Sequence, residues 1–100
     1  MLTKQQRLNA YEKALSMYTA DKFFEDGICV ALGDAHWGDY MKSPIVTWST
    51  TEKYFPELGN QGNPFPNKSS SYTDTEKNTR RILWLENAIM QLTEQPIESL

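Results

Sequence analysis

Reactive side chains are scarce in this chain of 100 residues, which contains one cysteine and one histidine. Cys29 and His36 are seven positions apart, and on a continuous helix this spacing would place them on one face. The histidine could then deprotonate the thiol and make it a nucleophile. However, we expect Gly33 to interrupt such a helix, and no oxyanion-hole signature surrounds Cys29. A structural cysteine and a surface histidine are therefore favoured over a catalytic dyad.

The carboxylates near the histidine in the sequence suggest a second possible function, metal binding. One cysteine and one histidine would fill only half of the four-ligand shell of a zinc site. Asp34, His36 and Asp39 could form an oxygen-rich site instead. Asp26 could add a fourth ligand, but the spacing matches no known metal-binding loop. We predict no metal, no cofactor and no enzymatic activity.

A third group of residues could bind a ligand without reacting with it. Arg80 and Trp84 are one helical turn apart, so the guanidinium could stack on the indole. Together with Arg81 they could hold the anionic group and the ring of a nucleotide. The structural alternative is a cation–π contact within the helix and a salt bridge to Glu76 or Glu57. This alternative is favoured, because the chain lacks a phosphate-binding P-loop.

Large aromatic residues are concentrated in the middle of the chain. Trp37, Tyr40 and Trp48 lie in a stretch without clear periodicity. Tryptophan and tyrosine often anchor protein interfaces, although in a small domain they are more often part of the core. Phe65, in the turn-rich segment 59–71, is the fourth aromatic that we assign to this group. The predicted partner-binding residues are therefore Trp37, Tyr40, Trp48 and Phe65.

The clearest helix in the sequence runs from Thr73 to Thr93 and should position the two arginines. Thr73 and Glu76 form a capping box at its start. Its apolar stripe has helical spacing and consists of Ile82, Leu85, Ile89 and Leu92, widened by Leu83, Trp84 and Ala88. The opposite side, which we expect to face water, carries Lys77, Arg81 and Gln91.

A second helix is predicted from Thr3 to Thr19, where Thr3 and Gln6 form another capping box. Its apolar stripe consists of Leu8, Tyr11, Leu15 and Tyr18. Two amphipathic helices of similar length at opposite ends of the chain suggest an antiparallel or crossed pair.

The segments between these helices are less clearly patterned. Residues 27–32 predict a short helix, with a buried strand as the alternative because two of them are β-branched. Residues 45–48 are the other strand-like piece. Ser49 and Glu52 offer a third capping box, for a short helix that ends at Tyr54.

Composition restricts the class of protein further. Thirteen acidic and ten basic residues give a net charge of −3, whereas a nucleic-acid-binding domain usually shows a basic excess. A single cysteine fits a reducing compartment, and no apolar run is long enough to cross a bilayer. We therefore expect a cytoplasmic protein that binds neither nucleic acid nor membrane. The length predicts one small domain over residues 1–100.

Several short motifs follow one another along the chain. They are Gly27-Ile28-Cys29, Phe55-Pro56-Glu57-Leu58, Phe65-Pro66, Arg81 and Leu85-Glu86-Asn87-Ala88-Ile89. Their order resembles small uncharacterised proteins of tailed phages and related mobile elements, over residues 23–93. The resemblance implies a virus-encoded accessory protein without catalytic residues. Such proteins often bind and block a host protein, including components of host defence.

Together these observations predict a mostly α-helical domain of two long amphipathic helices, two short ones and a long irregular loop. The favoured function is a non-enzymatic binding protein, an accessory or anti-defence inhibitor that acts on a host protein. A nucleotide-binding protein that uses Arg80, Arg81 and Trp84 is the first alternative. An enzyme built on Cys29 and His36 is the second. Self-association into a homodimer through the amphipathic helices is a further option.

Overall fold

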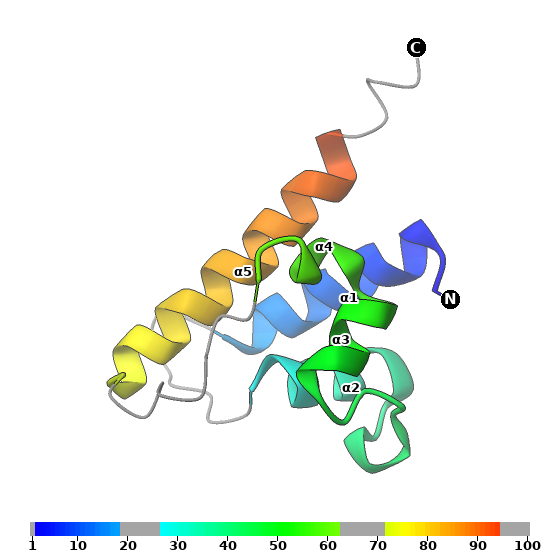
Figure 1. Ribbon diagram of the computed structural model, residues 1–100, viewed down its shortest axis with the longest axis horizontal. Helices are drawn as coiled ribbons and strands as arrows, with labels where there is room; N and C mark the ends of the chain where they lie inside the picture. Colours follow the sequence, from blue (N-terminus) through cyan, green and yellow to red (C-terminus); the bar gives the residue numbers. More distant parts are fainter. Residues whose placement is uncertain (1, 19–26, 63–71, 95–100) are drawn as a thin grey trace.

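The longest helix, α5 (Asp74–Glu94), runs along one side of the molecule (Figure 1). The computed structural model describes residues 2–18, 27–62 and 72–94 of the chain. α1 (Lys4–Met17) crosses α5 in roughly the opposite direction and contacts it directly. The predicted pairing of the first and last helices is therefore present.

Shorter helices cover the remaining sides of α1 and α5. α2 (Ile28–Trp37) packs on α1, and the 3-10 turn η1 (Tyr40–Lys42) packs on α2. α3 (Trp48–Tyr54) contacts α4 (Pro56–Gly59), which in turn packs on α5. The prediction of a mostly helical fold is confirmed, and no strand occurs in the ranges that the model describes.

The core lies where α1 meets its neighbours. Small residues form part of it, since Ala10 and Ala14 of α1, Ala31 of α2 and Ala88 of α5 are all buried. Larger side chains fill the space around them, namely Tyr11, Leu32, Ile45, Phe55, Leu58, Leu85 and Leu92. Alanine at a crossing lets two helices approach closely, while the larger residues supply most of the buried apolar area.

Two of the three predicted capping boxes are correct. Thr3 and Gln6 exchange side-chain and backbone hydrogen bonds at the start of α1. Thr73 and Glu76 do the same at α5, at 3.2 and 3.3 Å. The third box, at Ser49 and Glu52, is wrong.

The third capping box is formed two residues earlier, by Thr47 and Thr50. Trp48 is therefore the first residue of α3, and residues 45–48 are not a strand. Threonine is also a preferred N-cap residue, and the side chain of Ile45 is completely buried, which fixes the chain just before the cap. The alternative strand at residues 27–32 is also excluded, since these residues lie at the start of α2.

The prediction that Gly33 ends the second helix is wrong as well. α2 continues to Trp37 and ends at Gly38, whose φ of 76° is in the left-handed region. Gly33 lies inside the helix because other residues need its space. A Cβ atom at Gly33 would lie 2.8 Å from the Tyr40 ring and 3.2 Å from the Cβ of Ser43. The glycine thus allows η1 to pack against α2.

A buried charged cluster joins α1 to α4. The Arg7 guanidinium donates from Nε and Nη2 to the two carboxylate oxygens of Glu57, at 2.9 and 3.1 Å. The Tyr11 hydroxyl donates to the same carboxylate at 2.8 Å, and Arg7 Nη1 donates to the carbonyl of Leu2. Burial, followed by the charge of Glu57, raises the pKa of Tyr11 above its usual range. All three side chains are thus held by one another rather than by solvent.

Candidate functional site

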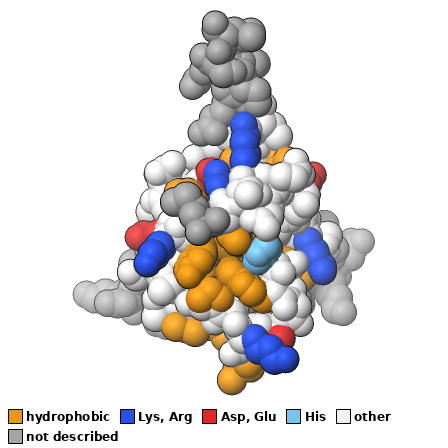
Figure 2. Space-filling view, turned by 90° about the vertical axis from the view of Figure 1, so that its right-hand side faces the viewer, with side chains coloured by type: hydrophobic (Ala, Val, Ile, Leu, Met, Phe, Trp, Pro, Cys, Tyr) orange, Lys and Arg blue, Asp and Glu red, His pale blue; other side chains and the backbone are white. Residues whose placement is uncertain are grey.

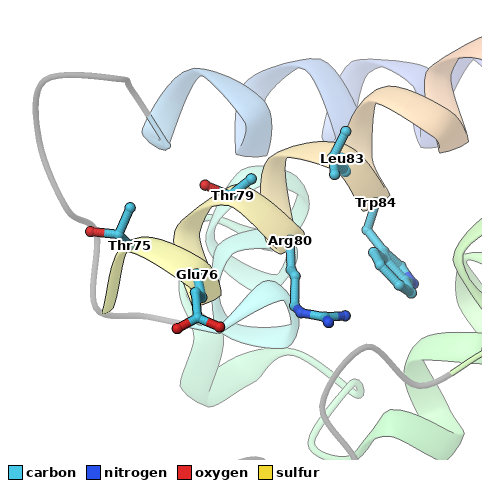
Figure 3. Close-up of a pocket in the computed structure, with 6 residues that line it drawn as sticks. All are labelled: Thr75, Glu76, Thr79, Arg80, Leu83 and Trp84. Atoms are coloured by element: carbon cyan, nitrogen blue, oxygen red, sulfur yellow. The ribbon is translucent and has the colours of Figure 1, made fainter. Parts of the chain in front are cut away.

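A hollow of about 430 Å³ lies beside the first half of α5. Its lining residues are Thr75, Glu76, Thr79, Arg80, Leu83 and Trp84 (Figure 3). Arg80 and Trp84 project from the same side of the helix, and the guanidinium extends toward the indole side. The structure therefore brings together two of the three residues that the sequence proposed for ligand binding.

Arg80 has a different aromatic partner from the one predicted. Its guanidinium carbon lies 4.3 Å above the centre of the Tyr72 ring, so it stacks on Tyr72 rather than on Trp84. Tyr72 precedes α5, so residue spacing along the helix could not identify this contact. Leu83, which we placed on the apolar stripe, is instead exposed at the rim of the hollow.

The two carboxylates that the sequence suggested as salt-bridge partners, Glu76 and Glu57, are engaged elsewhere. Glu76 turns back to the helix start, where its Oε1 accepts from the backbone N–H and the hydroxyl of Thr73. Glu57 is paired with Arg7 and Tyr11. The predicted salt bridge from this site to Glu57 is therefore wrong. Within the described ranges, no carboxylate lies at salt-bridge distance from Arg80.

Trp84 is fixed by polar contacts to the turn that follows α4. Its indole N–H donates to the carbonyl of Gly62 at 3.1 Å, and its own carbonyl accepts from the Gln61 amide at 2.9 Å. Asn87 donates to the other end of the Gln61 amide. The indole is thus oriented before any ligand arrives.

Arg81 is not part of this site, and its assignment to the water-facing side of the helix is wrong. Only 8% of Arg81 is exposed, and its guanidinium carbon lies 6.0 Å from the ring centre of Tyr18, at the end of α1. One residue advances the direction of a side chain by about 100° around a helix, so Arg80 and Arg81 leave α5 on different sides.

The predicted partner-binding aromatics are only partly exposed. Trp37 packs edge-on against Tyr54 and Phe55, with ring centres 5.9 and 6.4 Å apart. Tyr40 lies against Gly33, and Trp48 packs against the core. Among the ring contacts of the described residues, none joins these three aromatics to one another. The fourth residue, Phe65, lies outside the described ranges, as does most of the segment 59–71.

The most exposed large apolar side chains of the middle segment were missed by the sequence analysis. Met41 is 86% exposed and Val46 is 61% exposed. Both lie within residues 39–47, which we call the presenting loop. Its end of the molecule is shown in Figure 2, where hydrophobic side chains gather beside the single histidine, with Lys and Arg side chains around them. Neither residue type nor spacing signals exposure in an irregular segment, so no sequence pattern could have identified the pair.

Hydrogen bonds hold the presenting loop in one conformation. Asp34 accepts from the backbone of Tyr40, and Asp39 accepts from that of Met41. Further backbone donors in the loop are also paired, in Lys42, Ser43, Ile45 and Thr47. Because the two aspartates serve as caps, they stabilise the loop that carries Met41. Among the described residues no group of three His, Cys, Asp or Glu side chains could hold a metal ion.

Cys29 and His36 lie on the same helix after all, because α2 does not end at Gly33. The Cys29 Sγ lies 2.8 Å from the hydroxyl of Thr51, which donates its only hydrogen to the carbonyl of Thr47. The thiol must therefore be the donor in this contact. Burial raises the pKa of Cys29, which disfavours the thiolate that a nucleophile requires.

Comparison of the chain with protein-family models, with curated proteins and with solved structures finds no match. Across the described ranges, no helix has the length and apolar character needed to cross a bilayer. What the chain does must therefore be argued from its own surface.

Proposed function

We propose that this protein is a non-enzymatic binding protein, and that the presenting loop contacts a partner protein. The observation that carries the proposal is the exposure of Met41 and Val46 on a loop whose backbone is held by hydrogen bonds. A rigid loop loses little conformational freedom on binding, so most of the contact energy is retained.

The neighbouring side chains support the same surface. Trp37 and Tyr54 are half-buried and lie close to the loop at the end of α2 and of α3. Half-exposed aromatics beside small apolar contacts are typical of interface centres. Lys42 and Lys53 are exposed on the same elements. The expected partner surface is an apolar hollow with acidic groups around it.

The biological setting of this proposal comes from the resemblance to proteins of tailed phages and mobile elements. On that basis the partner is a host protein in the cytoplasm, and binding would inhibit it, with host defence components as the first candidates. The non-enzymatic part of the proposal is supported by Cys29, whose thiol is a hydrogen-bond donor to Thr51 rather than a free thiolate.

Capture of a host protein by two double variants tests whether the presenting loop is the contact surface. The Met41→Asp/Val46→Asp double variant places charges on the presenting loop, while the matched control, Leu83→Asp/Met90→Asp, places them on exposed apolar positions of α5. Both should show wild-type thermal unfolding. Immobilised wild type and control should retain the same host protein, and the loop variant should not.

Two results would contradict the proposal. Equal capture by all three proteins would exclude the presenting loop as the contact. Loss of capture only in the α5 control would move the interface to the groove of about 480 Å³ that Leu15, Leu83, Ile89 and Met90 form between α1 and α5. That groove is also where a homodimer through the amphipathic helices would form, and sedimentation of the Leu83→Asp/Met90→Asp variant tests it.

A further inference from the structure

The hollow beside α5 contains an arginine that no carboxylate of the described residues neutralises. Arg80 is stacked on Tyr72, and Glu76 and Glu57 are both committed to other donors. Stacking fixes the plane of a guanidinium but uses none of its five N–H groups. The guanidinium N–H groups, which form a planar fork, therefore remain available to a hydrogen-bond acceptor from outside the protein.

The second wall of the hollow is an aromatic plate. Trp84 stands one turn after Arg80, and its indole N–H is already occupied by the carbonyl of Gly62. With the polar edge of the ring satisfied, its π face is what a ligand would meet. Flat rings stack favourably on such faces. A guanidinium and an indole one helical turn apart thus favour a ligand that has both a negative charge and a ring.

The rim supplies further polar groups. Thr79 lines the hollow as well, but Figure 3 shows its side chain on the other side of α5 from the Arg80 guanidinium. Glu76 also lines the hollow, and its Oε2 keeps its capacity to accept. Figure 3 shows Glu76 and Trp84 on opposite sides of Arg80 along α5, so the carboxylate lies away from the indole on which a ring would stack.

From these contacts we infer that the hollow binds a small anion that carries a flat heteroaromatic ring. The phosphate or carboxylate binds the Arg80 fork, and the ring lies on Trp84. The hollow of about 430 Å³ is large enough for a ligand of nucleoside monophosphate size, since small-molecule pockets begin at roughly 300 Å³. This site is distinct from the presenting loop, so it would give the protein a small-molecule ligand in addition to a protein partner.

The three tryptophans give a direct readout of ligand position. In a spectrum of the 15N-labelled protein, each indole N–H contributes one signal, and Trp84→Phe identifies the signal of Trp84. Adenosine monophosphate and indole-3-acetate serve as the phosphate and carboxylate probes. Either should shift the Trp84 signal saturably and leave the signals of Trp37 and Trp48 in place. Inorganic phosphate and adenosine, each with half of the required chemistry, should bind more weakly.

Two variants distinguish specific binding by Arg80 from non-specific attraction of the anion to positive charge on α5. Arg80→Gln removes the fork and should weaken binding by about tenfold or more, the usual effect of losing a charged hydrogen-bond donor. Lys77→Gln removes the same charge from a position on α5 that does not line the hollow, and should change affinity by less than about twofold. Arg80→Lys keeps the charge without the planar guanidinium, so its affinity for the probes should lie between those of the other two variants.

The inference is wrong if neither probe moves the Trp84 signal at millimolar concentration. It is also wrong if Arg80→Gln binds as well as wild type, or if inorganic phosphate alone binds as tightly as adenosine monophosphate. Because Arg80 makes no ion pair with a described residue, its variants should lose less than about 1 kcal/mol of stability and stay folded, which keeps each of these outcomes interpretable.

Discussion

Replacing Arg7 by methionine tests whether the buried charged cluster holds α1 to α4. The variant keeps the length and apolar stem of the side chain but leaves the Glu57 carboxylate with Tyr11 alone. Both ion-pair partners are nearly enclosed, with 13% of the Arg7 side chain and 6% of the Glu57 side chain exposed. An isolated carboxylate in such a place is costly, because the protein supplies no opposite charge.

The magnitude follows from what is lost. Arg7 makes two hydrogen bonds to the carboxylate and one to the carbonyl of Leu2. Removing one partner of a buried ion pair costs about 3–5 kcal/mol, and the residual exposure of Arg7 puts the expected loss at about 3 kcal/mol. For a chain of this length about 1 kcal/mol shifts the unfolding midpoint by roughly 4–8 °C, so the midpoint should fall by more than about 10 °C.

Denaturant unfolding followed by circular dichroism measures the loss, and two controls define its cause. Arg80→Met removes the same side chain from a site without a carboxylate partner, and should cost less than about 1 kcal/mol. The Arg7→Met/Glu57→Gln double variant has no unpaired carboxylate at this position, so it should be more stable than Arg7→Met alone. A loss below about 1 kcal/mol, or no recovery of stability in the double variant, would refute this reasoning.

Three further predictions concern single positions. Cys29 in the folded protein should react slowly with iodoacetamide at neutral pH, because burial raises the pKa of its thiol; a rate equal to that of the unfolded chain would contradict this. Gly33→Ala should destabilise the fold by roughly 1–3 kcal/mol, because the new methyl group would meet the Tyr40 ring; unchanged stability on denaturation would exclude this packing. The raised pKa of Tyr11 stabilises the fold fully below about pH 10, and this stability is lost at higher pH as the unfolded chain ionises. Tyr11→Phe should therefore unfold with a flatter dependence on alkaline pH than wild type, as thermal melts across that range would show.

The helices at the ends of the chain were predictable because their signals are local. Periodicity and a capping box lie within a few residues of one another, and the structure places both where the sequence does at Thr3 and at Thr73. The same local reasoning failed at Gly33. A glycine near the end of a short helical pattern can mark a terminus, but here it lies inside the helix and makes room for Tyr40, seven residues later in the chain.

Burial of a charged residue is also decided by tertiary contacts. Arg81 and Arg80 are identical in type and adjacent in sequence, yet Arg81 faces Tyr18 of α1 and Arg80 faces the hollow. The apolar stripe predicted that Arg81 lies on the opposite, water-facing side of the helix, and only the position of the end of α1 explains why it is buried. The exposure of Met41 could not be predicted for the same reason, because it depends on which elements cover the loop.

The pairing of charges links the fold to the ligand site. Arg80 could have formed an ordinary salt bridge, since the chain offers Glu76 one turn away and Glu57 across the fold. Arg7 binds Glu57 in a bidentate pair, and Thr73 holds Glu76 at the helix start, so among the described residues neither carboxylate pairs with Arg80. Which arginine can bind an external anion thus depends on how the donors share these carboxylates. For Glu76 this is decided at the start of α5, and for Glu57 at the contact between α1 and α4.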